Sequence, residues 1–235
     1  MTNNLTNFVK FGKKIAGAGL NYKSLLAERK LVLPSTPVIF LKPTSSYITE
    51  GQNIQLANTL VVLSSTAEDG EIEVPPNSEV HEEVELGVVI GSRCKKVSED
   101  SALQYVGGYC LALDLTDVVQ IKLSRAAGLP WTWGKGFDTA CPVSRLLFPE
   151  ELKDPQDVQL WCRVNGDLRQ DCNTADMVFP VSVLISFISH HMTLEPGDLI
   201  LTGSPAGVGP IAPGDTVQAG LGNILTMTFP VKITD

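Results

Sequence analysis

The stretch HEEVELGVVI, residues 81–90, joins a cluster of acids directly to a run of apolar residues. The run from Leu86 to Ile90 predicts a buried strand. Side chains alternate along a strand, so Glu83 and Glu85 are expected on the same face, about 7 Å apart along the backbone. Two like charges on one face need water, a basic partner or a cation. Solvent exposure is the simpler interpretation of an isolated Glu-x-Glu pair, but the apolar run indicates that this strand enters the core.

A second apolar run, residues 109–113, predicts another strand and ends at Asp114. One interpretation of Asp114 is a helix cap, although the polar residues after it are able to cap the same helix. The other interpretation groups Asp114 with Glu83 and Glu85 in a site of hard oxygen ligands, which suits Mg²⁺ or Mn²⁺. Zinc is less expected, because none of the three histidines has ligand spacing with a cysteine.

Two further segments carry residues that suit a small anionic ligand. Lys135 stands between two glycines in WTWGKGFD, residues 131–138. It is either a surface lysine or, near the three carboxylates, a group that holds an anionic substrate. The loop LTGSPAGVG, residues 201–209, lacks the ending of a phosphate-binding loop. Its residues Gly203 and Ser204 offer a backbone N–H and a hydroxyl to a carboxylate.

Strand signals dominate the second half of the chain. Asn165-Gly166 between two apolar runs predicts a hairpin, and apolar residues alternate with polar ones from Leu225 to Thr234. Helices are expected at residues 98–106, 116–127 and 180–191. Runs of strands with helices among them predict an α+β, mostly β fold. We expect a basic N-terminal arm at residues 1–14 and one catalytic domain at residues 15–235.

Composition narrows the classes of function. The 235 residues carry a net charge of −8, which argues against nucleic-acid binding. The longest apolar stretch, residues 177–188, is too short to cross a bilayer, so no membrane span is expected. Five scattered cysteines without a CxxC pattern argue against a disulfide framework and favour a reducing compartment.

The N-terminal segment has the opposite charge to the rest of the chain. Residues 1–30 contain six basic residues and the single acid Glu28, a net charge of +5. Transit peptides are basic and poor in acids, although they usually prefer arginine, and this segment has only Arg29. A mitochondrial location and a solvated basic arm on a cytoplasmic protein are both consistent with this pattern.

Several segments together resemble the fumarylacetoacetate hydrolase superfamily, and in particular its small mitochondrial acylpyruvase and oxaloacetate decarboxylase/tautomerase members. The matching segments are FLKP (40–43), HEEVELGVVIG (81–91), YVGGY (105–109), GLPWT (128–132), CPVS (141–144), VNG (164–166) and LTGSPAGVGP (201–210). The resemblance implies a mixed β-roll or sandwich fold of the type of that family's C-terminal domain, and a homodimer. It implies Mg²⁺ or Mn²⁺ held by Glu83, Glu85 and Asp114. Lys135 falls on the family's active-site lysine, and Ser204 replaces a threonine of its Thr-Gly-Thr-Pro loop.

The chain departs from the family pattern in two places. Members typically read Gly-Arg-Asn-Tyr-x-x-His-x-x-Glu in a lid segment whose His–Glu pair activates water. Here Leu20 and Leu25 stand at the arginine and histidine positions, and only Glu28 remains. After Asp114, where members usually read Thr-Ala-Arg-Asp, Val118 takes the place of a substrate-binding arginine.

These residues predict an enzyme that depends on Mg²⁺ or Mn²⁺ and acts on small α-keto dicarboxylic or diketo acids. Loss of a general base costs a hydrolase about 10²–10⁴-fold. We therefore expect oxaloacetate decarboxylation or keto–enol tautomerisation to survive better than acylpyruvate hydrolysis, with Glu28 as a weak base.

Two other classes stay open. One is a non-catalytic metal-binding paralogue, which the substitution at Leu25 favours. The other is a dinucleotide-binding oxidoreductase, suggested by Gly17-Ala18-Gly19. Its fingerprint lacks the third glycine, because Tyr22 stands there.

Overall fold

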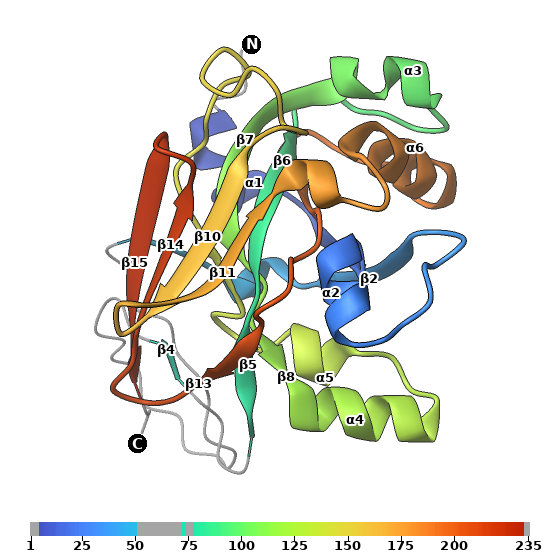
Figure 1. Ribbon diagram of the computed structural model, residues 1–235. Helices are drawn as coiled ribbons and strands as arrows, with labels where there is room; N and C mark the ends of the chain where they lie inside the picture. Colours follow the sequence, from blue (N-terminus) through green and yellow to red (C-terminus); the bar gives the residue numbers. More distant parts are fainter. Residues whose placement is uncertain (1–4, 51–71, 74–77, 233–235) are drawn as a thin grey trace, which may run out of the picture.

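Three β-sheets form the framework of the protein, and helices lie around them (Figure 1). The structure is a computed structural model that describes residues 5–50, 72–73 and 78–232. The described helices are α1 (Phe8–Phe11), α2 (Lys23–Glu28), α3 (Glu99–Ala102), α4 (Val118–Ala127), α5 (Thr132–Lys135) and α6 (Val181–His191). Short 3₁₀ turns cover Leu5–Asn7, Thr44–Ser46, Leu103–Tyr105 and Thr174–Asp176.

The largest sheet contains seven strands of mixed direction. They are β1 (Ile15–Gly19), β2 (Val38–Lys42), β3 (Tyr47–Thr49), β6 (Val84–Ile90), β7 (Val106–Leu113), β9 (Cys141–Val143) and β12 (Leu199–Leu201). Their order is β2-β1-β12-β6-β7-β9-β3. The pairs β1–β12 and β3–β9 are parallel, and the other pairs are antiparallel.

Two smaller sheets complete the framework. One contains β4 (Ile72–Glu73), β10 (Gln159–Val164), β11 (Asp167–Asn173), β14 (Thr216–Leu221) and β15 (Leu225–Lys232). Its order is β11-β10-β14-β15-β4. The other contains β5 (Val80–Glu82), β8 (Thr116–Asp117) and β13 (Gly209–Ile211), in the order β13-β5-β8. This architecture confirms the α+β, mostly β prediction and the mixed β-roll or sandwich type.

The centre of the large sheet is buried on both faces, which explains why the sequence of its strands is almost continuously apolar. All seven residues of β6 are buried. Leu86 and Val88 contribute to the larger apolar cluster, which also takes in Phe229 from the five-stranded sheet. Val89 faces a second, smaller cluster together with Phe8. A polar side chain in these central strands therefore needs a partner inside the protein, and this constraint shapes the site described below.

The hairpin and the final strand form as the sequence predicts. Asn165 and Gly166 connect β10 to β11 with φ angles of 54° and 88°, the left-handed values that this turn requires. In β15, burial alternates from residue to residue up to Lys232. The last two residues of the expected strand lie outside the described residues.

Two expected helices begin or end elsewhere than predicted. The prediction for 98–106 was wrong at its end, because helical structure stops at Tyr105 and Gly107 lies inside β7. A Cβ on Gly107 would lie 2.6 Å from the Cα of Gly91, so the glycine permits close strand packing and does not end a helix. The expected helix 116–127 begins at Val118, because the preceding residues form β8.

Part of the expected N-terminal arm packs against the domain. Phe8 is buried, and Lys14 forms an ion pair with Asp198 next to β12. Residues 1–4 lie outside the described residues, and the boundary between arm and domain at residue 14 stays a prediction. Among the described residues, no helix is long and apolar enough to cross a membrane.

Candidate active site

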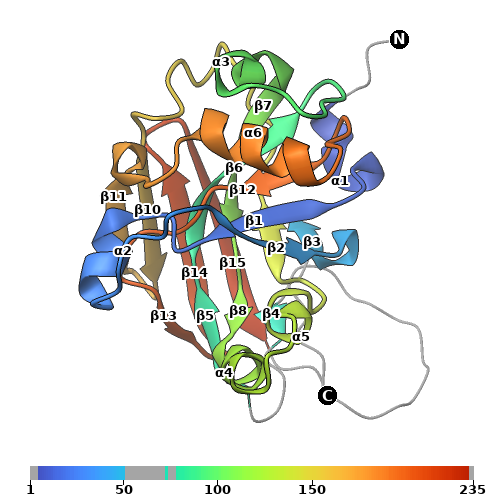
Figure 2. The ribbon, with the colours of Figure 1, turned by 90° about the vertical axis from the view of Figure 1, so that its right-hand side faces the viewer.

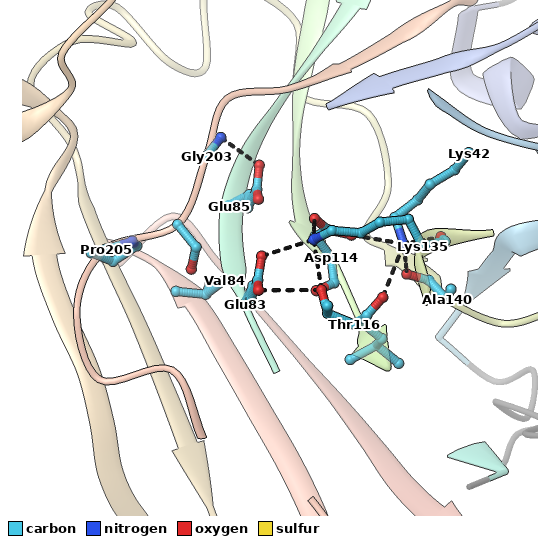
Figure 3. A network of polar contacts seen from close by, with 12 residues as sticks. Lys42, Glu83, Val84, Glu85, Asp114, Thr116, Lys135, Ala140, Gly203 and Pro205 are labelled. Atoms are coloured by element: carbon cyan, nitrogen blue, oxygen red, sulfur yellow. Dashed lines mark hydrogen bonds and ion pairs between the residues drawn. The ribbon is translucent and has the colours of Figure 1, made fainter. Parts of the chain in front are cut away.

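The three acids singled out in the sequence meet where β6 and β7 run side by side. Val84 pairs with Leu113 across the two strands, which places Glu83 and Glu85 beside Asp114 at the end of β7. The backbone N–H of Asp114 donates to the carbonyl of Glu83 at 2.8 Å. One carboxylate oxygen from each acid lies within 4.8 Å of the other two. The arrangement is close enough for all three side chains to coordinate one ion (Figure 3).

Lys135, at the end of α5, lies between these acids. Its ammonium donates to Glu83 at 3.1 Å, to the Thr116 hydroxyl at 2.6 Å, and to Asp114. The same ammonium lies 4.5 Å from the centre of the Phe40 ring. Lys135 is only 6% exposed, so it is not the surface lysine that the sequence left as an alternative.

Lys42 approaches Asp114 from the opposite side, at the end of β2. Its ammonium donates to the carbonyls of Leu115, Lys135 and Ala140 at 3.0, 2.5 and 2.9 Å. These three bonds use all three hydrogens of the ammonium. The same ammonium forms an ion pair with the buried Asp114 Oδ1 at 2.7 Å.

Burial and these neighbours set the protonation states of the buried groups. Burial opposes the charged forms of Asp114 and Lys135, but their mutual attraction is stronger. The pKa of Asp114 is consequently below its usual range, and the pKa of Lys135 is above its usual range. Burial, together with the charges of Asp114 and Glu83, raises the pKa of Glu85 well above its usual value. Of the three carboxylates, Glu85 is therefore the one whose ionisation an additional positive charge would favour most.

The donor set fits a divalent metal ion. The site offers carboxylate oxygens only, which are the ligands preferred by Mg²⁺ and Mn²⁺. Asp114 already has two cationic partners, Lys42 and Lys135, whereas Glu85 receives one bond, from Gly203 N–H at 2.5 Å. A bound cation would stabilise the ionised form of Glu85.

The loop of small residues, 201–209, contacts the site through Gly203, whose backbone N–H donates a hydrogen bond to the carboxylate of Glu85 (Figure 3). Ser204 is buried, and its hydroxyl accepts a hydrogen bond from Gln170 Nε2 at 2.9 Å. Gln170 also accepts from Val84 N–H at 2.8 Å, so it ties the loop to β6. In these positions Gly203 and Ser204 support the acid cluster, and a direct contact with substrate stays a prediction.

A pocket of about 260 Å³ includes Glu83 and Lys135 in its lining, together with residues of α2 and α4. Figure 2 shows the positions of these two helices and of α5 in the fold. Leu25 and Val118 line this pocket, at the positions where the family pattern has histidine and arginine. Glu28 does not line the pocket. It lies on the exposed end of α2, where it accepts a hydrogen bond from Gly207 N–H at 3.2 Å.

The structure adds three residues that the sequence interpretation did not place in the site. Lys42 and Thr116 contact the acid cluster directly, and His81 lines the pocket with its Nε2 2.6 Å from Glu79. Lys42 belongs to one of the matching segments, so its position in the FLKP motif was the available signal. His81 stands two residues before Glu83, which follows the end of β5, and this spacing was the corresponding signal.

A larger cavity of about 630 Å³ lies next to this pocket but contains none of the three acids. It is mostly apolar and is bounded by β2, α6 and the loop before α5. Phe40 and Trp131 line both cavities, with ring centroids 6.2 Å apart. These two rings therefore form the wall between the larger cavity and the acid cluster.

Comparison with known proteins identifies the family of this arrangement. Residues 14–232 match the family model described as fumarylacetoacetate (FAA) hydrolase C-terminal. The chain is 43% identical to "Oxaloacetate decarboxylase, mitochondrial" of Dictyostelium discoideum, over 97% of both chains. It is 40% identical to the human "Oxaloacetate tautomerase FAHD1, mitochondrial", over 97% of this chain and 96% of the human one.

Solved structures agree with the sequence relatives. A yeast fumarylacetoacetate hydrolase family protein superposes with a TM-score of 0.81 at 35% identity, over 97% of this chain and 96% of the yeast chain. A family protein from Yersinia pestis gives the same TM-score at 34% identity, over 94% of this chain and 93% of that one. The chain therefore belongs to the fumarylacetoacetate hydrolase family.

Proposed function

We propose that this protein is a divalent-metal-dependent enzyme that acts on small α-keto acids, with Mg²⁺ or Mn²⁺ held by Glu83, Glu85 and Asp114. The observation that carries the proposal is the convergence of these three carboxylates and Lys135 at a pocket that Glu83 and Lys135 line, with Glu85 and Asp114 buried beside them. The names of the mitochondrial oxaloacetate relatives support the substrate class. They also support a mitochondrial location in preference to a cytoplasmic one.

Among the reactions of such substrates, we propose oxaloacetate decarboxylation or keto–enol tautomerisation ahead of acylpyruvate hydrolysis. Both favoured reactions develop negative charge on the keto oxygen, and a bound metal would supply Lewis-acid stabilisation of that charge. Lys135 remains an ammonium, because the adjacent carboxylates raise its pKa, and it supplies a second positive charge beside the same oxygen.

Decarboxylation forms the enolate by releasing CO₂ and needs no base at that step. Tautomerisation passes the C3 proton, which a chelated metal would acidify, to water or a weak base. Hydrolysis needs a base for its attacking water, which this pocket supplies poorly. A water molecule must lose a proton as it attacks the carbonyl carbon. Leu25 is an apolar residue, 5% exposed, at the position from which the family's lid histidine would take that proton. Glu28 remains the proposed weak base, although it does not line the pocket and accepts a hydrogen bond from Gly207 N–H.

The first experiment compares turnover of oxaloacetate and acetylpyruvate with and without Mg²⁺, in the natural protein and in Glu83→Gln. Glu82→Gln is the matched control, since Glu82 is the adjacent glutamate but pairs with Arg169 and Gly209 N–H, away from the acid cluster. We expect metal-dependent turnover that Glu83→Gln abolishes and Glu82→Gln retains, with oxaloacetate as the better substrate.

The buried Leu25 keeps a second candidate open, a non-catalytic metal-binding member of the same fold. Binding of Mn²⁺ without turnover of either keto acid would establish this alternative. We also propose a homodimer, as the family resemblance implies, and sedimentation of the purified protein measures its mass directly.

A further inference from the structure

The pocket above the acid cluster changes in character from its base to its mouth. At its base are the charged groups of Glu83 and Lys135. Its middle is walled by apolar side chains: Leu20, Leu25, Phe40, Val118, Ile121 and Trp131. At the mouth the lining residues Arg29, Lys122 and Arg125 are exposed, together with the single acid Glu79. A ligand that fills the pocket therefore passes from a polar base through an apolar section to a mouth where three cations outnumber one acid.

One face of α4 carries much of this change from apolar to cationic side chains. Val118, Ile121, Lys122 and Arg125 are spaced i, i+3, i+4 and i+7, so they form a single stripe along the helix. The stripe is apolar at Val118 and Ile121 and cationic at Lys122 and Arg125. Seven residues of helix span roughly 10 Å, which separates the guanidinium end of the stripe from the acid cluster.

Cations outnumber acids at the mouth. Among the described residues, Arg29 and Arg125 form no ion pair, whereas Lys122 is close enough to Glu79 to lower the pKa of that carboxyl. Glu79 also bonds to His81 at 2.6 Å. Arg125 lies over the Trp131 ring at 4.9 Å, which orients its guanidinium at the rim of the pocket.

We propose that Arg125, assisted by Lys122 and Arg29, forms a second anion subsite, which selects α-keto acids that carry a distal carboxylate beyond an apolar spacer. The keto acid end faces the acid cluster, the spacer contacts Leu25, Val118 and Ile121, and the distal carboxylate meets the guanidinium of Arg125. This inference rests on the proposed function, since it assumes that the keto acid end binds at the metal site. It makes Arg125 a specificity-determining residue.

A matched pair of probes tests the proposal by binding alone. 2-Oxohexanoate and 2-oxoadipate have the same number of carbons and differ in the distal carboxylate. Their dissociation constants for the Mn²⁺-loaded protein are measured by calorimetry, with oxalate as a probe of the metal site. We expect 2-oxoadipate to bind roughly ten- to a hundredfold more tightly than 2-oxohexanoate, as a charge-assisted contact provides.

Arg125→Gln should remove this preference while leaving the affinity for 2-oxohexanoate and for oxalate unchanged. Arg163→Gln is the matched control, because Arg163 is also an exposed arginine that lies over a tryptophan, Trp161, and it does not line the pocket. Both variants change exposed side chains, so their melting temperatures should remain close to that of the natural protein.

The outcomes separate this inference from the proposed function. Equal affinity for the two probes, or a preference that Arg125→Gln keeps, would overturn the anion subsite while binding of oxalate left the metal site intact. Failure of the Mn²⁺-treated protein to bind oxalate or either probe would overturn the proposed function, and the subsite with it.

Discussion

The two walls of the pocket differ in the charge of the side chains that they carry. The strand wall, at the ends of β6 and β7, carries Glu83 at the pocket, and Glu85 and Asp114 lie buried beside it, bonded to Lys135, Lys42 and backbone N–H groups. The helix wall, from α2 and α4, presents leucine and valine. The family pattern described above has a histidine and an arginine at these two positions. Under the proposed function, metal binding belongs to the strand wall and proton transfer to the helix wall, so one wall can change while the other is retained.

The largest expected effect comes from the strand wall. Glu85→Gln should reduce metal-dependent turnover by at least about 10³-fold, because it removes a metal ligand and with it several kcal/mol of charge stabilisation. It should also abolish the rise in melting temperature that Mn²⁺ gives to the natural protein. Retained turnover and a retained Mn²⁺ shift would show that Glu85 is not a ligand.

The same variant should be more stable than the natural protein when metal is absent. The pKa of Glu85 is raised on folding, so its ionisation opposes the folded state once the pH exceeds the ordinary glutamate pKa of about 4.3. The advantage of Glu85→Gln should therefore increase as the pH rises above that value. Thermal melts in chelator across a pH series measure it, and a constant difference would contradict this explanation.

Lys135→Met should separate binding of metal from catalysis. Removing the ammonium next to Glu83 and Asp114 should strengthen binding of Mn²⁺, because a like charge is lost from the site. Turnover of oxaloacetate should nevertheless fall by roughly 10²-fold, since the cation no longer stabilises the developing charge. Calorimetric titration with Mn²⁺ and steady-state kinetics give the two values. Lys135→Arg, which keeps the charge, should recover part of the rate.

The helix wall is tested by Leu25→His. A histidine at this position of α2 should raise acetylpyruvate hydrolysis by about 10-fold or more, with little change in oxaloacetate decarboxylation. Leu25→Asn controls for polarity without a base. If both substitutions raise hydrolysis equally, or if neither does, the missing histidine is not what limits this reaction.

The smallest effect is expected from Val118→Arg, on the other half of the helix wall. The first residue of α4 is partly exposed, so the longer side chain extends along the pocket without entering the core. A guanidinium at this position should lower the KM for oxaloacetate by a few-fold, and the partly exposed contact limits the gain. Initial rates across an oxaloacetate concentration series measure it. Val118→Gln separates charge from side-chain length.

The sequence predicted the strand wall well, for a physical reason. An acid at the end of an apolar strand must be paired or bound when the strand is buried, so Glu83, Glu85 and Asp114 stood out without any knowledge of the fold. The hairpin at Asn165 was equally clear, because its backbone angles restrict the residue type.

The role of the helix wall and the contacts that support the acids were harder to predict from the sequence. Lys42 lies far from the acids in the sequence, and only the pairing of β2 within the large sheet brings it to Asp114. The stripe from Val118 to Arg125 has the pattern of an ordinary amphipathic helix until the pocket beneath it is known. Local patterns report which side chains need partners, and the tertiary fold decides which partners they receive.

The contacts of Lys42 also have a consequence for the proposed metal site when no metal is bound. Three carbonyl oxygens surround its ammonium in the way that they would surround a small monovalent ion, and Asp114 provides the opposite charge. The chain thus contains a permanent internal counterion, which cannot diffuse away when a chelator is added. Asp114 should keep its charge and orientation through cycles of metal removal, so that the emptied site takes up metal again without refolding.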